Sequence, residues 1–516
     1  MPEGTGLGTA EVGPAELRSA PVAAPGARPV PWRSVGVVAS LVAGVALAGV
    51  RVEPQVWGDP GVWLSVGARL LDGDRLYADV FDNKDPFFFY SYAAALWAGG
   101  VRGPFVLEVV WLGVATGGMA LALRALRVGT AAMLAGALVY PFALTAAWYV
   151  PGATMVPALA LAPLALWLWV RGSTSASGAL VVVSMLFKLN LGLVVAAPLL
   201  ALLALGGDGV SRRRRALEGL GGAGVALLLT AIVLAVRGEL HPYLDLIAYN
   251  VHYSDAGVHG GGVGAHLHVV RELFAAAGKW QLPAAELAAV VLLLTALVGW
   301  VRLGQTFRRV SAVAVAAFAA AMVTLAATAI FVVHLQMLAY PAALGAAMLV
   351  LVAKHVWKPF AALAAAGFVV FAVRSSLELE DLSRWTTGAW TTAPVSTPGH
   401  TLESARLVAF PGSERVTYAV LGRNTEDGHA AFVDGTMDLR CRYFHQYPFY
   451  RQDQLDETID CVRHEEPMLV LVTTSLYDPM RGQPRWEAFV AEARAVLASR
   501  YRLVSEAGMS QVWKRR

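Results

Sequence analysis

The sequence predicts a multi-pass α-helical membrane protein that ends in a small α/β domain. Of its 516 residues, 57% are hydrophobic and only 15% are charged, whereas a soluble chain has about 25% charged residues. The mean hydropathy is +0.55, and many apolar runs approach the roughly 20 residues that cross a bilayer as a helix. Beyond about residue 400, short apolar segments and amphipathic sequence replace these runs, which is typical of a domain outside the membrane.

Residues 1–33 are predicted to form a disordered cytoplasmic tail. They are rich in proline, alanine, glycine and serine and show no apolar period, so they have little surface to bury. The apolar run after Arg33 occupies the place of a signal peptide. Its length and the lack of a convincing cleavage site favour a retained first membrane helix.

About eleven membrane spans are predicted after this tail. The fifth is short, and a single long helix in place of the fifth and sixth is the alternative, which would invert the orientation of everything downstream. The predicted spans are 35–52, 105–124, 130–148, 154–170, 178–189, 190–206, 217–236, 285–303, 311–330, 335–353 and 359–374.

The basic residues between the spans favour the arrangement with two separate helices. If the N-terminus is cytoplasmic, every basic cluster falls on the cytoplasmic side, as the positive-inside rule expects. The residues that follow this rule are Arg18, Arg28, Arg33, Arg124, Arg127, Arg171, Arg212 to Arg215, Arg302, Arg308, Arg309, Lys354 and Lys358.

This orientation places two loops and the C-terminal domain outside the cytoplasm. In the first loop, apolar residues recur at helical spacing over 62–71, and aromatic residues crowd 86–98. Both patterns favour helices that lie at the membrane surface, with acidic residues between them. The predicted parts are a transmembrane domain at 34–374, its external loops at 53–104 and 237–284, and an extracytoplasmic α/β domain at 375–516.

The C-terminal domain is predicted from four segments. Residues 416–422 and 468–474 have the composition of short buried strands, and 484–500 has an amphipathic helical pattern. Residues 501–515 resemble a closing β-hairpin. These elements together predict a small α/β fold.

The only two cysteines of the chain, Cys441 and Cys461, both fall in this domain. If they pair, the bond closes a loop of about 20 residues and contributes on the order of 3 kcal/mol. Two buried free thiols are the alternative, and a disulfide requires an oxidising compartment.

Asp59 follows directly on the first predicted span. A carboxylate at the mouth of a membrane cavity is placed to take a proton from an acceptor hydroxyl. An ordinary solvated acid is the alternative, and it is the commoner role of an aspartate in a loop.

The segment VFDNKDPFFFY, residues 80–90, places Asp82, Lys84 and Asp85 directly before aromatic residues. An ammonium group beside a surface for a lipid chain suits a lipid-linked phosphate, because lysine binds phosphate as a point charge. It would also stabilise a departing phosphate electrostatically. Neutralisation of its acidic neighbours is an equally good role for Lys84.

The order of first span, acid, amphipathic helix, LYADVFDNKDP and aromatic-rich helix resembles the first external loop of the GT-C superfamily of polyprenyl-phosphate-sugar-dependent glycosyltransferases. It is most similar to the bacterial relatives of protein O-mannosyltransferases and aminoarabinose transferases. The resemblance implies that Asp59 is the catalytic base, although Pro60 stands where the family often has a second acid. It also implies a site role for Lys84, although Asp85 replaces the first proline of the family's His/Lys-Pro-Pro motif.

Weaker similarities extend into the spans. The segment MLFKLNLGL, residues 185–193, is similar to a lysine-bearing segment of the family and implies that Lys188 faces the same outer cavity as Lys84. A lone lysine in apolar sequence is costly and usually functional or paired, and a snorkelling lysine is the alternative. The segments YNVHY and VVHLQMLAYP supply further candidate sugar or phosphate contacts, each of which alone is more often a satisfied polar group: Asn250, His334 and Gln336.

The resemblance implies an inverting hexosyl- or pentosyltransferase of a bacterial cytoplasmic membrane. A sugar would move from a polyprenyl-phosphate donor to an acceptor hydroxyl of an envelope glycan, lipid or protein on the outer face. Asp59 would be the general base, and Lys84 and Lys188 would hold the phosphate. Asp82 or Asp85 would orient the acceptor or Lys84, or bind a divalent cation if the reaction needs one. A lipid donor requires no nucleotide fold, and no nucleic-acid partner is expected.

Two other classes of protein fit parts of the sequence. A transporter or flippase of lipid-linked sugars would carry charges near the bilayer midplane and broken helices in paired repeats. The charges cluster at one face instead, which favours surface chemistry. A non-catalytic envelope-assembly protein with a partner-binding tail is the third alternative. The histidines of loop 237–284 include a His-x-His pair, but no acid or cysteine stands at ligand spacing.

Overall fold

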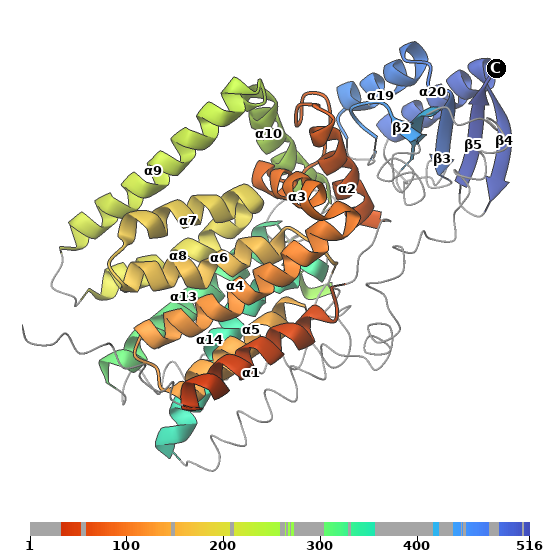
Figure 1. Cartoon of the computed structure of the whole chain (residues 1–516). Coiled ribbons are helices and arrows are strands. Elements are labelled where there is room, and N and C mark those ends of the chain that lie inside the picture. Colours follow the sequence, from red (N-terminus) through yellow and green to blue (C-terminus); the bar gives the residue numbers. More distant parts are fainter. Residues whose placement is uncertain are drawn as a thin grey trace, which may run out of the picture.

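The described residues form a bundle of helices and a smaller sheet domain beside one end of it (Figure 1). The computed structural model describes residues 32–52, 58–145, 150–206, 211–257, 264, 267–268, 270–272, 304–328, 332–356, 416–422, 437–444, 446, 450–473, 484–507 and 510–516.

Nine helices of the bundle coincide with predicted spans. They are α1 (Trp32–Gly49), α4 (Gly103–Ala125), α5 (Thr130–Leu144), α6 (Met155–Val170), α7 (Thr174–Phe187), α8 (Gly192–Leu205), α9 (Arg212–Val236), α13 (Gln305–Thr328) and α14 (Ala339–Val356). The spans predicted at 285–303 and 359–374 lie outside the described residues. The helical character of the membrane part is therefore confirmed, while the total of eleven spans stays a prediction.

Length and hydropathy identify which helices could cross a membrane. Among the described residues, four helical stretches are both long and apolar enough: 86–125, 212–236, 305–328 and 334–354. Five further apolar helices are shorter, and they include α5, α6 and α7. The bundle thus has the apolar helices of a multi-pass membrane protein.

Lys188 marks the break between the fifth and sixth predicted spans. Helix α7 ends at Phe187, Lys188 takes an extended backbone conformation, and a short 3-10 turn at Leu189–Leu191 leads into α8. The two helices lie side by side in the bundle (Figure 1). The prediction of two helices rather than one long helix is confirmed.

Close backbone contact brings α9 against α7. A β-carbon added at Gly178 would lie 2.0 Å from the carbonyl oxygen of Gly219, and one added at Gly222 would lie 1.9 Å from that of Ser175. Only glycine fits at these positions, as is common where membrane helices approach closely. This packing holds α7 and α9 together, and both helices line the apolar groove described below.

The loop predicted to be the first external one contains the two helices that the sequence predicts, α2 (Gly58–Leu71) and α3 (Pro86–Gly99). Proline at the first position of α3 suits a helix start, because its missing N–H has no partner there in any helix. The six aromatic residues of α3 were expected at the membrane surface, and for three of them this is wrong. Phe88, Phe89 and Tyr92 are buried in the protein core, whereas Trp97 is 80% exposed.

The loop predicted to be the second external one contains a helix that the sequence analysis missed. Helix α10 (Leu240–Gly257) covers part of the segment expected as an open loop at 237–284, and it lies next to α2 and α3 (Figure 1). Its buried residues include Tyr243, Leu246 and Tyr249, which recur at helical spacing. A 3-10 helix, η3 (Val332–Leu338), precedes α14.

The C-terminal domain is a five-stranded sheet with two described helices. The strand order is β2-β1-β3-β5-β4; β1 pairs with β2 and β3 in parallel, and β5 pairs with β3 and β4 in antiparallel. The predicted strands, helix and hairpin are confirmed, while β2 and α19 were not predicted. The elements are β1 (Val416–Leu421), β2 (Met437–Leu439), α19 (Gln452–His464), β3 (Leu469–Thr473), α20 (Pro484–Arg500), β4 (Tyr501–Ala507) and β5 (Ser510–Arg515).

Cys441 and Cys461 form a disulfide in this domain, with their Cα atoms 5.7 Å apart. The bond ties the segment after β2 to helix α19. Of the two alternatives that the sequence left open, the structure has the disulfide.

Candidate active site

The loop Asp82-Asn83-Lys84-Asp85 is fixed by hydrogen bonds from two sides. The hydroxyl of Tyr77 donates to the carbonyl oxygen of Lys84 at 2.7 Å, and the side-chain amide of Asn250 donates to that of Asn83 at 3.1 Å. The ring of Tyr77 in turn stacks on Tyr243 of α10, with centroids 5.7 Å apart. Helix α10 therefore holds the loop in place, and Asn250 contributes through its contact with the loop backbone.

Asp85 lies at the centre of this arrangement and is only 5% exposed. Its carboxylate accepts one hydrogen bond from the backbone N–H of Leu189 at 2.8 Å and one from the hydroxyl of Tyr243 at 3.1 Å. Burial raises the pKa of Asp85 to about 6, and these bonds together with Lys188 and Lys84 oppose the rise. Asp85 thus connects the first external loop to α10 and to the α7–α8 break.

Lys84 projects from the same loop above an aromatic ring. Its ammonium donates to the side-chain carbonyl of Asn83, lies 3.8 Å from a carboxylate oxygen of the buried Asp82, and lies 5.9 Å from the ring centre of Trp63. Asp82 also accepts a hydrogen bond from the backbone N–H of Lys84 at 3.2 Å. Asp82 is therefore placed to orient Lys84.

Lys188 reaches the same region from the α7–α8 break. Its charge interacts with those of Lys84, Asp85 and Asp59. His334 of η3 is buried and also lies within electrostatic range of both lysines. Two ammonium groups, two carboxylates and an imidazole from four separate segments thus share one site.

Asp59 stands in the first turn of α2 and is exposed. Its charge interacts with Lys188 and with Tyr92 of α3. Tyr92 is fixed by a hydrogen bond from its hydroxyl to the carbonyl oxygen of Gly152 at 2.9 Å. Asp59 therefore presents an accessible carboxylate at the edge of the lysine pair.

Gln336 does not belong to this group. It is 3% exposed, and its side-chain amide donates to the carbonyl oxygen of Leu144 at 3.1 Å. It therefore connects η3 to the end of α5. Of the eight predicted site residues, the structure brings together Asp59, Asp82, Lys84, Asp85, Lys188 and His334, and it gives Asn250 and Gln336 contacts with backbone carbonyls.

Glu239 is a buried acid beside the site that the sequence analysis did not single out. It is fully buried, forms an ion pair with Arg237 at 2.9 Å, and accepts hydrogen bonds from the backbone N–H of Leu76 and the hydroxyl of Tyr90. Arg237 also lies over the ring of Tyr90, 5.2 Å from its centre. An acid directly after a membrane span, in RGEL, is the signal that could have identified it.

An apolar groove of about 250 Å³ lies between α3, α7 and α9. It begins beside the lysines, since Pro86 follows Asp85 and Leu186 precedes Lys188 by two residues. Its lining residues are Pro86, Phe87, Tyr90, Val183, Leu186, Ala226, Leu229, Thr230, Val233 and Leu234. The apolar groove thus adjoins the charged groups of the site.

The described part of the chain contains no cluster of three or more His, Cys, Asp or Glu side chains arranged to hold a metal ion. The two described histidines of the second external loop, His241 and His268, are exposed, and each faces an acid one helical turn away. His252, His259 and His266 have no described side chain.

Comparison with known proteins gives relatives in structure alone. No protein-family model matches the chain, and no curated protein matches its sequence. The fold is similar to that of ArnT from Cupriavidus metallidurans bound to undecaprenyl phosphate: the two are 14% identical over 93% of this chain and 97% of that chain, with a TM-score of 0.54. It is also similar to the arabinofuranosyltransferase AftD from Mycobacteria, at 14% identity over 94% of this chain and 42% of that chain, with a TM-score of 0.51.

These likenesses show the fold alone. The chain has the GT-C fold, and the resemblance that the first external loop indicates is confirmed at this level. The match to ArnT extends over nearly the full length of both chains, whereas the match to AftD covers less than half of the AftD chain.

Proposed function

We propose that this chain is an inverting glycosyltransferase that moves a hexosyl or pentosyl group from a polyprenyl-phosphate donor to an acceptor hydroxyl. The observation that carries the proposal is the pairing of Lys84 and Lys188. Two ammonium groups within range of each other repel, so their approach favours a bound anion between them. The lipid phosphate is that anion.

The groove between α3, α7 and α9 supports a lipid as the carrier of this phosphate. Its walls are apolar and it adjoins the lysine pair, so one ligand with an anionic head and a hydrocarbon chain would occupy both. The ArnT structure of the same fold holds undecaprenyl phosphate. A polyprenyl phosphate has both required parts.

Asp59 is the general base in this proposal. Its carboxylate takes the proton of the acceptor hydroxyl while the hydroxyl oxygen forms a bond to the anomeric carbon. The bond from that carbon to the phosphate oxygen breaks on the opposite face, so the configuration inverts. The polyprenyl phosphate leaves with the electron pair, and Lys84 and Lys188 stabilise its developing charge.

The remaining residues position these groups. Asp82 orients Lys84 through the contacts described above, Asp85 holds the site loop against the α7–α8 break, and His334 lies within electrostatic range of both lysines. Asn250 acts by holding the loop backbone, and Gln336 by holding η3. A divalent cation is not required by this scheme.

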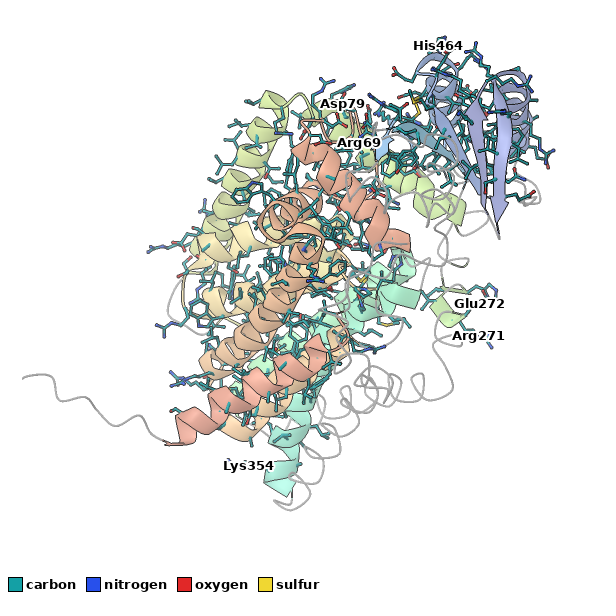
Figure 2. All side chains as sticks on the ribbon, turned by 45° about the vertical axis from the view of Figure 1, so that its right-hand side comes forward. Arg69, Asp79, Arg271, Glu272, Lys354 and His464 are labelled. Carbon is teal, nitrogen blue, oxygen red and sulfur yellow. A yellow bond between two sulfur atoms is a disulfide. The ribbon has the colours of Figure 1, made fainter. Side chains whose placement is uncertain are left out.

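The site end of the molecule is proposed to face outward from a bacterial cytoplasmic membrane. Asp79 and Arg69 lie near the C-terminal domain, while Lys354 lies at the opposite end of the bundle (Figure 2). Basic residues favour the cytoplasmic side, and a disulfide favours an oxidising compartment outside it. The transmembrane domain at 34–374 would carry the site, the domain at 375–516 would be extracytoplasmic, and the acceptor would be an envelope glycan, lipid or protein.

Turnover of a panel of polyprenyl-phosphate sugars by the purified chain tests the proposal. Released polyprenyl phosphate and glycosylated acceptor are expected from at least one donor with a crude envelope fraction as acceptor. Asp59→Asn should abolish transfer and leave donor binding intact, because the amide cannot accept the proton.

The contrary outcomes separate the alternatives. Movement of labelled donor across proteoliposomes without any product would identify a flippase. Full transfer by the Asp59→Asn variant would remove Asp59 from the mechanism. A complete lack of donor binding across the panel would contradict the transferase itself.

A further inference from the structure

The C-terminal domain contacts the first external loop through one buried guanidinium. Arg69, at the end of α2, is 9% exposed. It donates to the carboxylate of Asp74 at 2.5 Å, to the carbonyl oxygen of Cys441 at 2.6 Å and to that of Asp79 at 2.9 Å. A single side chain thus connects α2, the turn that precedes the site loop, and the disulfide segment of the C-terminal domain.

A second contact between the C-terminal domain and this loop involves Arg442, the residue after Cys441. The backbone N–H of Phe81 donates to the carbonyl oxygen of Arg442 at 3.1 Å. The ring of Phe81 packs among Tyr249 of α10 and two C-terminal-domain tyrosines, Tyr443 and Tyr450, with centroid distances of 5.4, 5.0 and 6.1 Å. Asp82, which orients Lys84, follows Phe81 directly.

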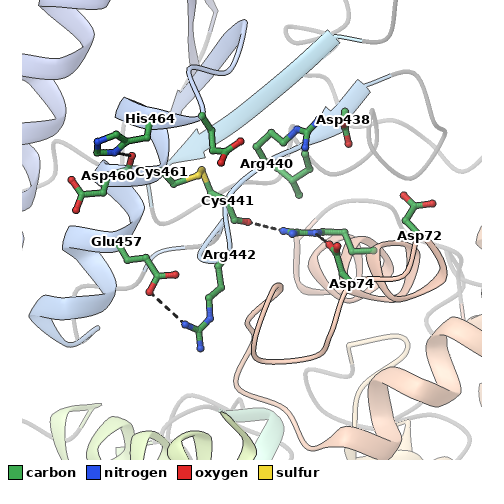
Figure 3. A pocket seen from close by; sticks show the side chains of 13 residues that line it. Asp72, Asp74, Asp438, Arg440, Cys441, Arg442, Glu457, Asp460, Cys461 and His464 are labelled. Atoms are coloured by element: carbon green, nitrogen blue, oxygen red, sulfur yellow. Dashed lines mark hydrogen bonds and ion pairs between the residues drawn. A yellow bond between two sulfur atoms is a disulfide. The ribbon is translucent and has the colours of Figure 1, made fainter. Parts of the chain in front are cut away.

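The disulfide determines where these two carbonyl groups lie. Cys441 has a φ of 74°, a conformation that non-glycine residues rarely adopt, and its sulfur is bonded to Cys461 of α19. The Arg69 guanidinium donates to the Cys441 carbonyl oxygen at the edge of a cavity of about 520 Å³ between the domains. Figure 3 shows this cavity and the disulfide beside it. The strained residue therefore presents its carbonyl to Arg69 while its side chain is tied to the domain.

We propose that Arg69 and the Cys441–Cys461 disulfide are positioning elements of the phosphate site. They fix the C-terminal domain against residues 79–82 so that Lys84 stays beside Lys188. This rests on the proposed function, and it makes the C-terminal domain a required part of the site. Breaking the disulfide frees the two carbonyls, loosens the loop and separates the lysine pair.

Reduction of the folded protein gives a clean test, because Cys441 and Cys461 are the only cysteines of the chain. Hydrogen exchange of the peptide covering 79–85 is measured before and after dithiothreitol, together with the KM for the donor. We expect faster exchange at the Phe81 amide and a KM higher by roughly tenfold to a hundredfold, the scale of a small misplacement of site groups.

Matched variants assign the effect. The Cys441→Ala/Cys461→Ala variant should have the properties of the reduced protein and should not respond to dithiothreitol. Arg69→Gln should raise the donor KM in the same way under oxidising conditions. Arg463→Gln is the control: Arg463 lies on the same helix as Cys461 and pairs with Asp460 and Glu492, away from the site loop. It should leave exchange and KM unchanged.

The exchange measurement does not depend on catalysis, so it separates this proposal from the proposed function. Unchanged exchange at 79–85 after complete reduction would overturn the positioning role even in an active enzyme. A lower thermal midpoint with an unchanged donor KM would show that the disulfide only stabilises the C-terminal domain. If exchange becomes faster on reduction but the chain turns over no donor, the contact between the C-terminal domain and residues 79–82 is supported. Only the proposed transferase function is then contradicted.

Discussion

The carboxylate of Asp85 accepts a hydrogen bond from the backbone N–H of Leu189, 2.8 Å away and 104 positions later in the chain. Leu189 follows Lys188, and Asp85 follows Lys84, so this bond joins the two segments that carry the lysines, whose charges interact. The helix break at Lys188 is what frees the Leu189 N–H to make the bond. Asp85 therefore connects two segments and does more than neutralise its neighbour.

Asp85→Asn is expected to tighten donor binding near neutral pH. Burial raises the pKa of Asp85 to about 6, so wild-type Asp85 loses its charge as the pH falls through this value. The positive charges of the two lysines are then less neutralised by Asp85. We therefore expect the affinity for a phosphodiester donor to rise by about threefold to tenfold. The Asp85→Asn variant would show the tighter affinity already at neutral pH, and its affinity should not change across this window.

A phosphodiester donor suits this measurement, because it does not titrate near this pH. Binding is measured without acceptor, so proton transfer does not contribute. A raised pKa also means that the protonated carboxyl stabilises the fold, and that this stabilisation is lost as the pH rises through about 6. The thermal midpoint of Asp85→Asn should therefore not be lower than that of wild type at neutral pH, and a large decrease would contradict this account.

Lys84→Ala and Lys188→Ala are each expected to weaken donor binding. A charge-assisted hydrogen bond contributes about 1.5 to 3 kcal/mol, which corresponds to roughly a tenfold to hundredfold loss of affinity. If both lysines bind one phosphate, the double variant should lose less than the sum of the single losses. Calorimetric titration with a polyprenyl phosphate measures all three variants.

Lys354→Ala is the matched control for these substitutions. Lys354 is exposed and lies at the end of the bundle opposite Asp79 (Figure 2). It should bind donor like wild type. Equal losses in Lys354→Ala and Lys188→Ala would indicate a general charge effect and would contradict a phosphate site at the lysine pair.

Local sequence predicted the helices and the candidate charges but not the contacts between them. Hydropathy located α1 and α4 to α9. A lone charge in apolar sequence indicated Lys188, and a charged run directly before aromatic residues indicated Lys84. The role of Asp85 depends on Leu189 and Tyr243, which lie far away in the chain, so no local pattern encodes it.

Two further differences between the sequence predictions and the structure also arise from contacts between distant parts of the chain. The aromatic run of α3 was assigned to the membrane surface because aromatic residues favour that boundary, yet Trp63 offers it a protein surface: its ring lies 5.2 Å from that of Phe88 and 6.2 Å from that of Tyr92. Helix α10 was missed because its apolar face is short and mixed with polar residues. Its partner Tyr77 becomes visible only in the folded chain.

Ala226→Phe is expected to impair donors according to the length of their lipid chain. Ala226 lines the apolar groove, and a phenyl ring there would displace about two methylene groups of a bound chain, a loss of about 1.6 kcal/mol. The KM of a long-chain donor should rise by roughly tenfold, while that of a donor with a short chain should stay the same. Leu227→Phe is the control, since Leu227 is exposed on the same helix and does not line the groove. Equal effects on both donors would exclude the groove as the chain-binding site.

Gly152→Ala is expected to destabilise the site through Tyr92. Gly152 has a φ of 81°, and an added β-carbon would lie 1.9 Å from the Tyr92 hydroxyl. Glu108 accepts a hydrogen bond from the Gly152 N–H, and Tyr92 donates to its carbonyl oxygen, so neither neighbour can move without losing a bond. Strain and overpacking together should cost roughly 2 to 4 kcal/mol.

The thermal midpoint and the transfer rate of Gly152→Ala should therefore both fall, because Tyr92 lies within electrostatic range of Asp59. Gly113→Ala is the matched control: Gly113 lies in α4, and a β-carbon there would meet no atom within 4 Å. A midpoint equal to that of wild type in both variants would show that the backbone at Gly152 adapts freely, and Tyr92 would then not depend on it for its position.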